Sequence, residues 1–310
     1  MQRPVFDTAT ETGGADLGRL PEWDLSDLYP AMDSPELAAD FDKAASRIEA
    51  FAAAYQGKLG SLDGDALAAA IAENEEIELL LGRIMSYAGL LYQQNTQDTA
   101  RAKFMGDCQG RYTQITQPMV FFTLELNRLD DAHLDGLMDE SAALTRYRPW
   151  LGRLRSFRPH QLSDELETFL HDQSVVGASA WNRLFDETMS GLTFDVEGYD
   201  APMGLSETLN LLSNQERSER EAGGKALAAT LDQNIRLFTL ITNTLAKEKE
   251  IEDRWRKLPA PDHGRHLANH VEPEVVDALR EAVVAAYPRI SHRYYAMKAK
   301  WLGLEALEYW

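Results

Sequence analysis

Residues 34–57 read SPELAADFDKAASRIEAFAAAYQG, and this stretch has the signature of an amphipathic helix. Its larger apolar side chains recur every three or four positions, a spacing that places them on one face of a helix. They are Leu37, Phe41, Ala44, Ile48, Phe51 and Tyr55. Ser34 can cap the start of the helix, Pro35 fits its first turn, and Gly57 can end it. The pattern therefore predicts a helix between Ser34 and Gly57.

Two longer helical runs follow and show the same periodicity. The first covers roughly residues 65–94, and the second runs from Thr99 to about Arg128 after a polar break. Pro118 lies inside the second run. Because proline lacks an N–H and its ring clashes with the preceding turn, it predicts a kink there. Three long helices joined by short polar turns are typical of antiparallel packing.

The chain between residues 162 and 204 predicts shorter elements. Two short helices are expected from Leu162 to Met189, the first capped by Ser163. Residues 192–196 (LTFDV) then alternate apolar and polar side chains, as a half-buried strand does. With two glycines close behind them, they predict a small β-hairpin near residues 192–204.

Two further long helices are predicted beyond the hairpin. The first runs from Ser218 to Trp255, and the second covers about residues 273–302, with a break at Pro288. The predicted fold class is therefore mainly α: a helical lobe of long antiparallel helices plus one small β-hairpin.

The predicted helices divide the chain into three parts. Residues 1–20 are polar and predict a flexible N-terminal tail. Residues 21–190 form an N-terminal helical lobe, and residues 191–310 contain the hairpin and the start of a second domain.

Composition excludes several classes of function. The chain has 310 residues, 44% hydrophobic and 26% charged, which is the balance of a globular protein. Its net charge of -19 repels phosphate backbones and anionic lipids, so neither nucleic acid nor membrane is expected as a partner. Cys108 is the only cysteine and predicts a small buried side chain, not a disulfide. The first twenty residues show no secretory signal, which predicts a cytoplasmic location.

The seven histidines decide the search for catalytic chemistry. None is followed by Glu, so the H-E-x-x-H zinc-peptidase motif is absent, and so is its reversed form. His263, His266 and His270 form the one histidine cluster, but they follow a proline-containing loop with no carboxylate fixed beside them. Packing or surface roles are expected for them more than a zinc site. The residues therefore give no catalytic, metal-binding or cofactor-binding assignment.

Several charged and aromatic side chains leave two interpretations open. Residues 247–250 (KEKE) predict a solvated helix face, or contact with a substrate. Arg155 and Arg158 could bind a carboxylate, although pairing with a helix C-terminus is expected. Trp255 and Trp301 are expected to be core or inter-helix contacts in preference to stacking platforms.

Six segments spread along residues 21–310 carry a family resemblance. They are WDLSDLY at 23–29, RPHQLSDELE at 158–167, AWNRLFDE at 180–187, KEKEIEDRW at 247–255, RISHRYY at 289–295 and KAKWLGL at 298–304. In their order and spacing they resemble the N-terminal portion of the M3 zinc metallopeptidases of the oligoendopeptidase F type. The resemblance implies that residues 191–310 begin a zincin-like helical peptidase domain.

The resemblance also implies a function for the longer protein. Family members are cytosolic zinc endopeptidases that cleave short peptides in a channel between two helical lobes. Their H-E-x-x-H helix follows the segment that matches 289–310, so Zn²⁺ is implied for the full-length enzyme and none for this chain. Short peptides and the C-terminal catalytic half are the implied partners, and the chain alone is expected to be inactive.

The C-terminal residues fit this expectation. Residues 302–310 (LGLEALEYW) are rich in apolar side chains and have no helix stop signal, so they are expected to lack a packing partner. The alternative function is a stand-alone helical scaffold without catalysis. The reading frame after Trp310 discriminates the two, because only the enzyme needs an H-E-x-x-H motif there.

Overall fold

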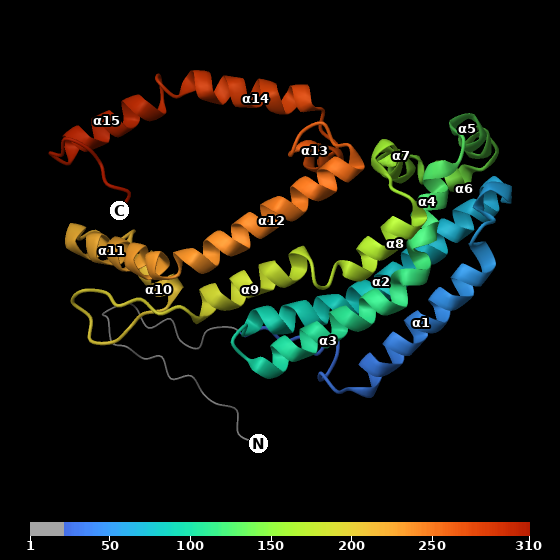
Figure 1. Ribbon diagram of the computed structural model, residues 1–310, viewed down its shortest axis with the longest axis horizontal. Coiled ribbons are helices and arrows are strands. Elements are labelled where there is room, and N and C mark those ends of the chain that lie inside the picture. Colours follow the sequence, from blue (N-terminus) through green and yellow to red (C-terminus); the bar gives the residue numbers. More distant parts are fainter. Residues whose placement is uncertain (1–21) are drawn as a thin grey trace.

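The computed structural model describes residues 22–310, which fold as a mainly helical structure (Figure 1). The predicted tail at residues 1–20 lies outside the described residues. The elements are α1 (Pro35–Tyr55), η1 (Leu59–Ser61), α2 (Gly64–Gln94), α3 (Thr99–Thr116), η2 (Gln117–Met119), α4 (Val120–Arg128), α5 (Asp131–Glu140), α6 (Ala142–Thr145), α7 (Arg148–Ser156), η3 (Arg158–His160), α8 (Asp164–Gln173), α9 (Ala178–Gly191), α10 (Leu205–Leu211), α11 (Arg217–Gln233), α12 (Ile235–Arg256), α13 (His263–Asn269), α14 (Pro273–Ala286) and α15 (Ser291–Trp301). Within residues 22–310, no helix is both long enough and apolar enough to cross a bilayer.

Helix α1 forms where its capping residues predict it. The Ser34 side-chain oxygen accepts a hydrogen bond from the Leu37 N–H at 3.3 Å, and Pro35 occupies the first turn. Gly57 follows the helix with a φ of 75°, a left-handed conformation that glycine adopts without steric cost. The predicted apolar face is buried except for Tyr55, which is half-buried.

The core lies between the first helices. Helices α1, α2 and α3 pack side by side and run antiparallel, as predicted (Figure 1). Phe51 lies at the centre of the larger cluster, and its ring meets the Phe122 ring edge-on at 5.1 Å. The smaller cluster surrounds Tyr29, Tyr87 and the buried Cys108. Burial raises the pKa of the Cys108 thiol to about 11, so this side chain acts as a small hydrophobe.

Pro118 divides the predicted third helix as expected. It lies in the short 3₁₀ helix η2, which separates α3 from α4. The break at Pro288 is confirmed as well, because α14 ends at Ala286 and α15 starts at Ser291.

The predicted β-hairpin is wrong. Phe194 and Met203 exchange two backbone hydrogen bonds of 2.9 Å, but this pair is an isolated bridge, and residues 22–310 contain no strand. Pro202 has no N–H to offer a ladder, and α10 begins at Leu205. The alternating side chains still mark the buried face, because Phe194 and Val196 belong to a third apolar cluster.

The predicted single helix from Ser218 to Trp255 is also wrong. It is divided into α11 and α12 at Asn234, which has non-helical backbone angles. The Asn234 side chain donates a hydrogen bond to the Thr230 carbonyl at 3.0 Å, and this bond favours the end of α11. Helices α5, α6, α7, α10 and α13 are not predicted by the apolar periodicity, because each has ten residues or fewer.

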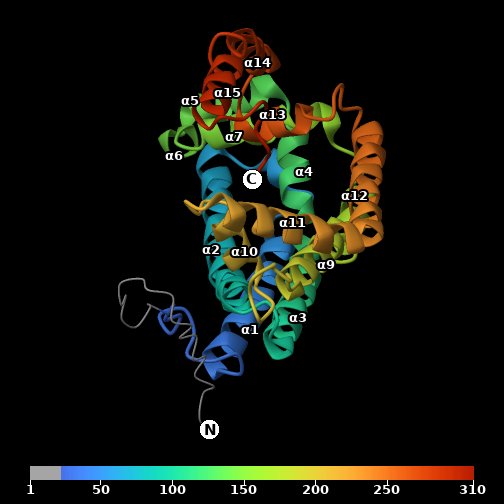
Figure 2. The same cartoon turned by 90° about the vertical axis from the view of Figure 1, so that its left-hand side faces the viewer.

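Helices α14 and α15 form an arm on the opposite side of the molecule from α1 and α3 (Figures 1 and 2). The C-terminal residues return from this arm to α11, which corrects the expectation that they lack a packing partner. The Tyr309 hydroxyl donates to the Gly224 carbonyl at 2.6 Å, and Arg220 Nε donates to the backbone oxygen of Trp310 at 3.1 Å. Tyr309 and Leu302 are nevertheless exposed, so the predicted apolar surface is only partly covered.

Two glycines of α2 provide a matched test of how closely this helix packs against α5. A Cβ on Gly64 would lie 2.5 Å from the Leu137 carbonyl oxygen and 2.6 Å from Ser141 Cβ. Gly64→Ala is therefore expected to lower the free energy of unfolding by about 2 kcal/mol. Gly82→Ala is the control: its Cβ meets nothing within 4 Å, and it should stabilise the helix by about 1 kcal/mol. Urea unfolding measures the free energy of unfolding of both variants. If both lose the same stability, the close approach of Gly64 to Leu137 and Ser141 is contradicted.

Candidate functional site

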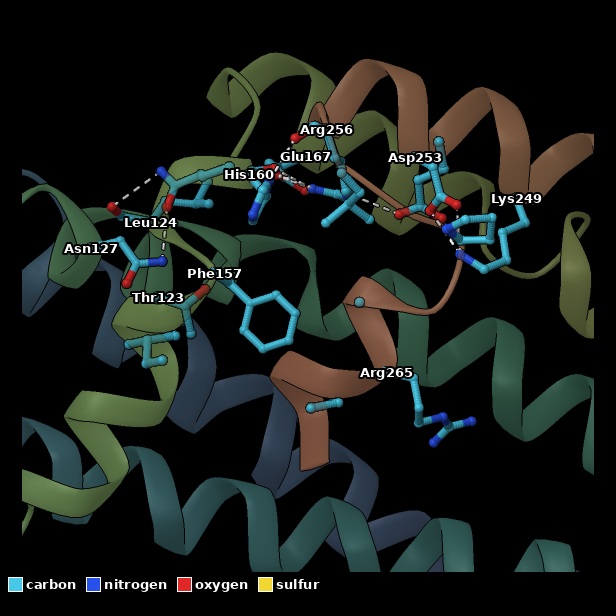
Figure 3. Close-up of a pocket in the computed structure, with 17 residues that line it drawn as sticks. Thr123, Leu124, Asn127, Phe157, His160, Glu167, Lys249, Asp253, Arg256 and Arg265 are labelled. Carbon is cyan, nitrogen blue, oxygen red and sulfur yellow. Dashed lines mark hydrogen bonds and ion pairs between the residues drawn. The ribbon is translucent and has the colours of Figure 1, made fainter. Parts of the chain in front are cut away.

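Two cavities lie where α4, α8 and α12 meet. The first has a volume of about 610 Å³ and also contacts η3 and α13 (Figure 3). The second has a volume of about 590 Å³ and extends towards α2 and α3. Both volumes are typical of small-molecule sites in proteins. The lining shared by the two cavities consists of Thr123, Leu124, Glu167, Glu252 and Arg256.

An ion pair between α8 and α12 forms the boundary of the two cavities. Arg256 donates from both terminal nitrogens to the Glu167 carboxylate, at 2.7 and 3.0 Å (Figure 3). The Arg256 and Glu167 side chains are only 21% and 15% exposed. This two-point geometry fixes the orientation of both groups as well as their separation. The pair therefore holds the C-terminal end of α12 against the first turns of α8.

Glu167 also binds the chain that leads into α8. The Leu162 N–H, which precedes the helix, donates to Glu167 Oε1 at 2.8 Å. The predicted cap is not formed, because Ser163 occupies the N-cap position but its side chain makes no capping hydrogen bond. Burial alone would raise the pKa of Glu167, but the hydrogen bonds from Arg256 and Leu162 and the Arg256 charge outweigh burial and lower this pKa.

The other contacts of Arg256 tie α12 to η3. Arg256 Nε donates to Glu252 at 2.7 Å, and Nη1 donates to the His160 carbonyl at 3.3 Å. In return, His160 Nδ1 lies 2.9 Å from the Arg256 carbonyl. Because a carbonyl only accepts, Nδ1 must carry the proton. The hydrogen bonds to Glu167 and Glu252 raise the pKa of Arg256, so it remains a cation.

The lowered pKa of Glu167 gives a prediction about acid. A depressed folded-state pKa contributes stability above the unfolded value, about pH 4.3, and this contribution is lost as the pH falls through the folded value. Glu167→Gln is therefore expected to be less stable than the parent chain at pH 7, with the difference shrinking below pH 4. Urea unfolding at several pH values measures the stability of the variant and the parent chain. If the difference between the two does not change with pH, the lowered pKa of Glu167 is refuted.

The three clustered histidines do not converge. Each has its own partner: His263 meets the His160 ring at 5.5 Å, His266 Nε2 lies 3.4 Å from Asp262, and His270 accepts from Arg153 Nε at 2.8 Å. Across residues 22–310, no group of three or more His, Cys, Asp or Glu side chains is arranged to hold a metal ion.

The two arginines with open interpretations have structural roles. Arg155 donates to the carbonyls of Leu126 and Leu129 at 2.8 and 2.7 Å, which confirms the predicted pairing with a helix C-terminus. Both arginines also bind the Asp131 carboxylate at the start of α5, Arg155 through Nε at 3.1 Å and Arg158 through Nη1 at 3.2 Å.

The KEKE segment and the two tryptophans differ from the expectations. Glu248 and Lys249 are not only a solvated face, because each lines one of the cavities. The expectation that Trp255 and Trp301 are covered is wrong, since they are 58% and 69% exposed. Helices α12 and α15 each leave one side without a covering element within the described part of the chain, which leaves these indoles in solvent.

Comparisons with known proteins point to one family. The family model described as Oligopeptidase F matches residues 125–194, a segment that includes Asn127, His160 and Glu167. Oligopeptidase PepF of Bacillus subtilis is 24% identical over 290 residues, which cover 91% of this chain and 42% of that protein. Group B oligopeptidase PepB of Streptococcus agalactiae is 24% identical over 247 residues, or 76% of this chain and 40% of that protein.

A solved structure shares the fold. The crystal structure of oligoendopeptidase-F from Enterococcus faecium superposes with a TM-score of 0.76 at 21% identity. The superposition covers 88% of this chain and 54% of that one, so this chain spans less than half of the curated relatives and about half of the structural neighbour. In sequence the chain is therefore similar to oligopeptidases of the oligoendopeptidase F type, and it shares the fold of one of them.

Proposed function

We propose that this chain is the N-terminal part of a cytosolic, zinc-dependent oligoendopeptidase that hydrolyses short peptides inside an enclosed channel. The observation that carries the proposal is the match of residues 125–194 to the Oligopeptidase F family model. This segment contains α8 and Glu167, which form part of the wall of both cavities. Two relatives that bear the name oligopeptidase extend the similarity over most of the chain.

The residues present do not fit a zinc site. The sequence has no H-E-x-x-H motif, and the described residues form no group of potential ligands. We therefore assign the zinc ion and the general base to a C-terminal catalytic half, and no catalytic or metal-binding residue to this chain. Its proposed role is to supply the channel wall and to restrict access to the catalytic centre.

The arm is the proposed contact surface for that half. Helix α14 has no buried residue, and Leu279 in its middle is 65% exposed. An isolated helix of this length is marginal in water and gains stability when an apolar face is covered. The exposed apolar side chains of the arm are Val275, Leu279, Val283, Val284, Tyr287, Ile290, Tyr294, Tyr295, Met297 and Trp301. We infer that a C-terminal half, as present in the longer relatives, covers this surface.

The test is peptide hydrolysis with and without the sequence encoded after Trp310. The 310-residue chain, incubated with Zn²⁺ and a quenched-fluorescent nonapeptide, is expected to show no turnover. The same assay on the chain extended by its downstream reading frame should show turnover that EDTA abolishes. A stop codon directly after Trp310 would overturn the proposal and favour the helical scaffold. EDTA-sensitive turnover by the 310-residue chain would overturn the assignment of zinc to the other half.

A further inference from the structure

The two cavities adjoin, and together we call them the groove; the charged side chains at its middle are hydrogen-bonded to one another. They share five lining residues and therefore adjoin at the pair of Glu167 and Arg256. Arg256 also binds Glu252, so the charged side chains of this middle section satisfy one another. Charges without partners, which could attract a ligand, lie in the two ends.

One end of the groove is cationic. Lys249, Asp253 and Arg265 line only the first cavity, and Lys249 pairs with Asp253 at 2.7 Å. Arg265 makes no hydrogen bond or ion pair with any residue from 22 to 310, and its side chain extends away from the Glu167–Arg256 pair (Figure 3). The apolar side chains of Phe157 and Leu258 line the same cavity. A free guanidinium beside apolar side chains suits a carboxylate attached to an apolar residue.

The other end is acidic. Glu78 and Glu248 line only the second cavity. Glu248 accepts the Ala178 N–H at 3.0 Å, whereas Glu78 accepts only from the Asn74 side-chain amide at 2.9 Å and pairs with no cation among the described residues. Burial and the negative charge of Glu78 both raise the pKa of Tyr112, which lines the same cavity.

These ends complement the two termini of a short peptide. We propose that the groove binds short peptides with free termini, with the α-carboxylate at Arg265 and the α-ammonium at Glu78. The inference deepens the proposed function, on which it rests for the choice of a peptide as ligand. It predicts that the chain selects short free peptides over internal segments of proteins, because an internal segment lacks both terminal charges.

Isothermal titration of the 310-residue chain tests this proposal. The probe is the hexapeptide Ala-Ala-Phe-Ala-Ala-Phe with free termini, compared with its C-terminal amide and its N-acetyl form. Each blocked form is expected to bind about tenfold more weakly, because a charge-assisted contact is lost. Arg265→Gln should weaken binding of the free peptide about tenfold and abolish the effect of amidation. Glu78→Gln should likewise weaken binding of the free peptide about tenfold, and it should abolish the effect of N-acetylation.

Two controls make the result decisive. Arg280→Gln removes an exposed cation of α14 that does not line the groove, and it should leave all three affinities unchanged. Circular dichroism confirms that each variant is folded. The proposal is overturned if free and blocked peptides bind equally, if Arg265→Gln weakens the free peptide and the amide alike, or if no binding is detected at 1 mM peptide. The proposed function is tested separately. It fails if the extended chain shows no turnover, even where the 310-residue chain binds peptides in a way that depends on their free termini.

Discussion

Phe51→Ala is expected to lower the free energy of unfolding by about 3 to 5 kcal/mol, the usual cost of truncating a fully buried phenylalanine. The Phe51 side chain has no solvent exposure, and its ring lies 4.8 Å from Tyr55, 6.1 Å from Phe121 and 5.1 Å from Phe122. Truncation removes these contacts from α1 and η2–α4 and leaves a cavity that rigid helices cannot fill. Urea unfolding followed by circular dichroism measures the loss.

Leu79→Ala is the matched control for this core prediction. Leu79 lies on α2 but is 74% exposed, so its truncation should change the free energy of unfolding by no more than about 0.5 kcal/mol. If both variants lose the same stability, the cluster around Phe51 is not the core that holds α1, α2 and α4 together.

Arg256→Met is expected to cost about 3 kcal/mol, at the lower end of the range for breaking a buried ion pair because both side chains keep some exposure. The variant leaves the Glu167 carboxylate in a largely desolvated position with only the Leu162 N–H as a partner. It also removes the hydrogen bonds to Glu252 and His160, so α12 loses its main polar attachment to η3 and α8. Thermal and urea unfolding measure the effect.

Arg254→Met tests whether the position of the charge matters. Arg254 lies on the same helix, but it is exposed and lies 3.9 Å from Glu250. Exposed ion pairs of this kind contribute little, so this variant should unfold like the parent chain. An equal loss in the two variants would attribute the effect to the charge of α12 instead of the contact with Glu167.

The sequence predicts the N-terminal helices well because their signals are local. Ser34, Pro35 and Gly57 define α1 through contacts within a few residues, and Pro118 acts through its own missing N–H. The errors arise where local signals conflict with packing. The apolar periodicity continues through Asn234, so only the bond from its side chain to Thr230 indicates the break. The LTFDV alternation indicates burial correctly but not a strand, because Pro202 and α10 leave no room for a ladder.

The candidate site was beyond prediction for a different reason. Glu167 and Arg256 are 89 positions apart, and neither has a neighbour in the sequence that indicates its partner. Glu167 lies within a segment that carries the family resemblance, whereas Arg256 directly follows another. Residue type alone predicts exposed charges at both positions, and only the packing of α12 on α8 brings them together.

The uneven burial of the chain has a consequence for its dynamics. Residues of α1 and α2 occupy a continuous core, so their amide protons should exchange with solvent only when the whole lobe unfolds. Helix α14 has no buried side chain, and its amides can exchange through local fraying. Limited trypsin digestion should consequently cut first at Arg280, Arg289 and Arg293, and leave a resistant fragment that contains α1 and α2 and ends before the arm.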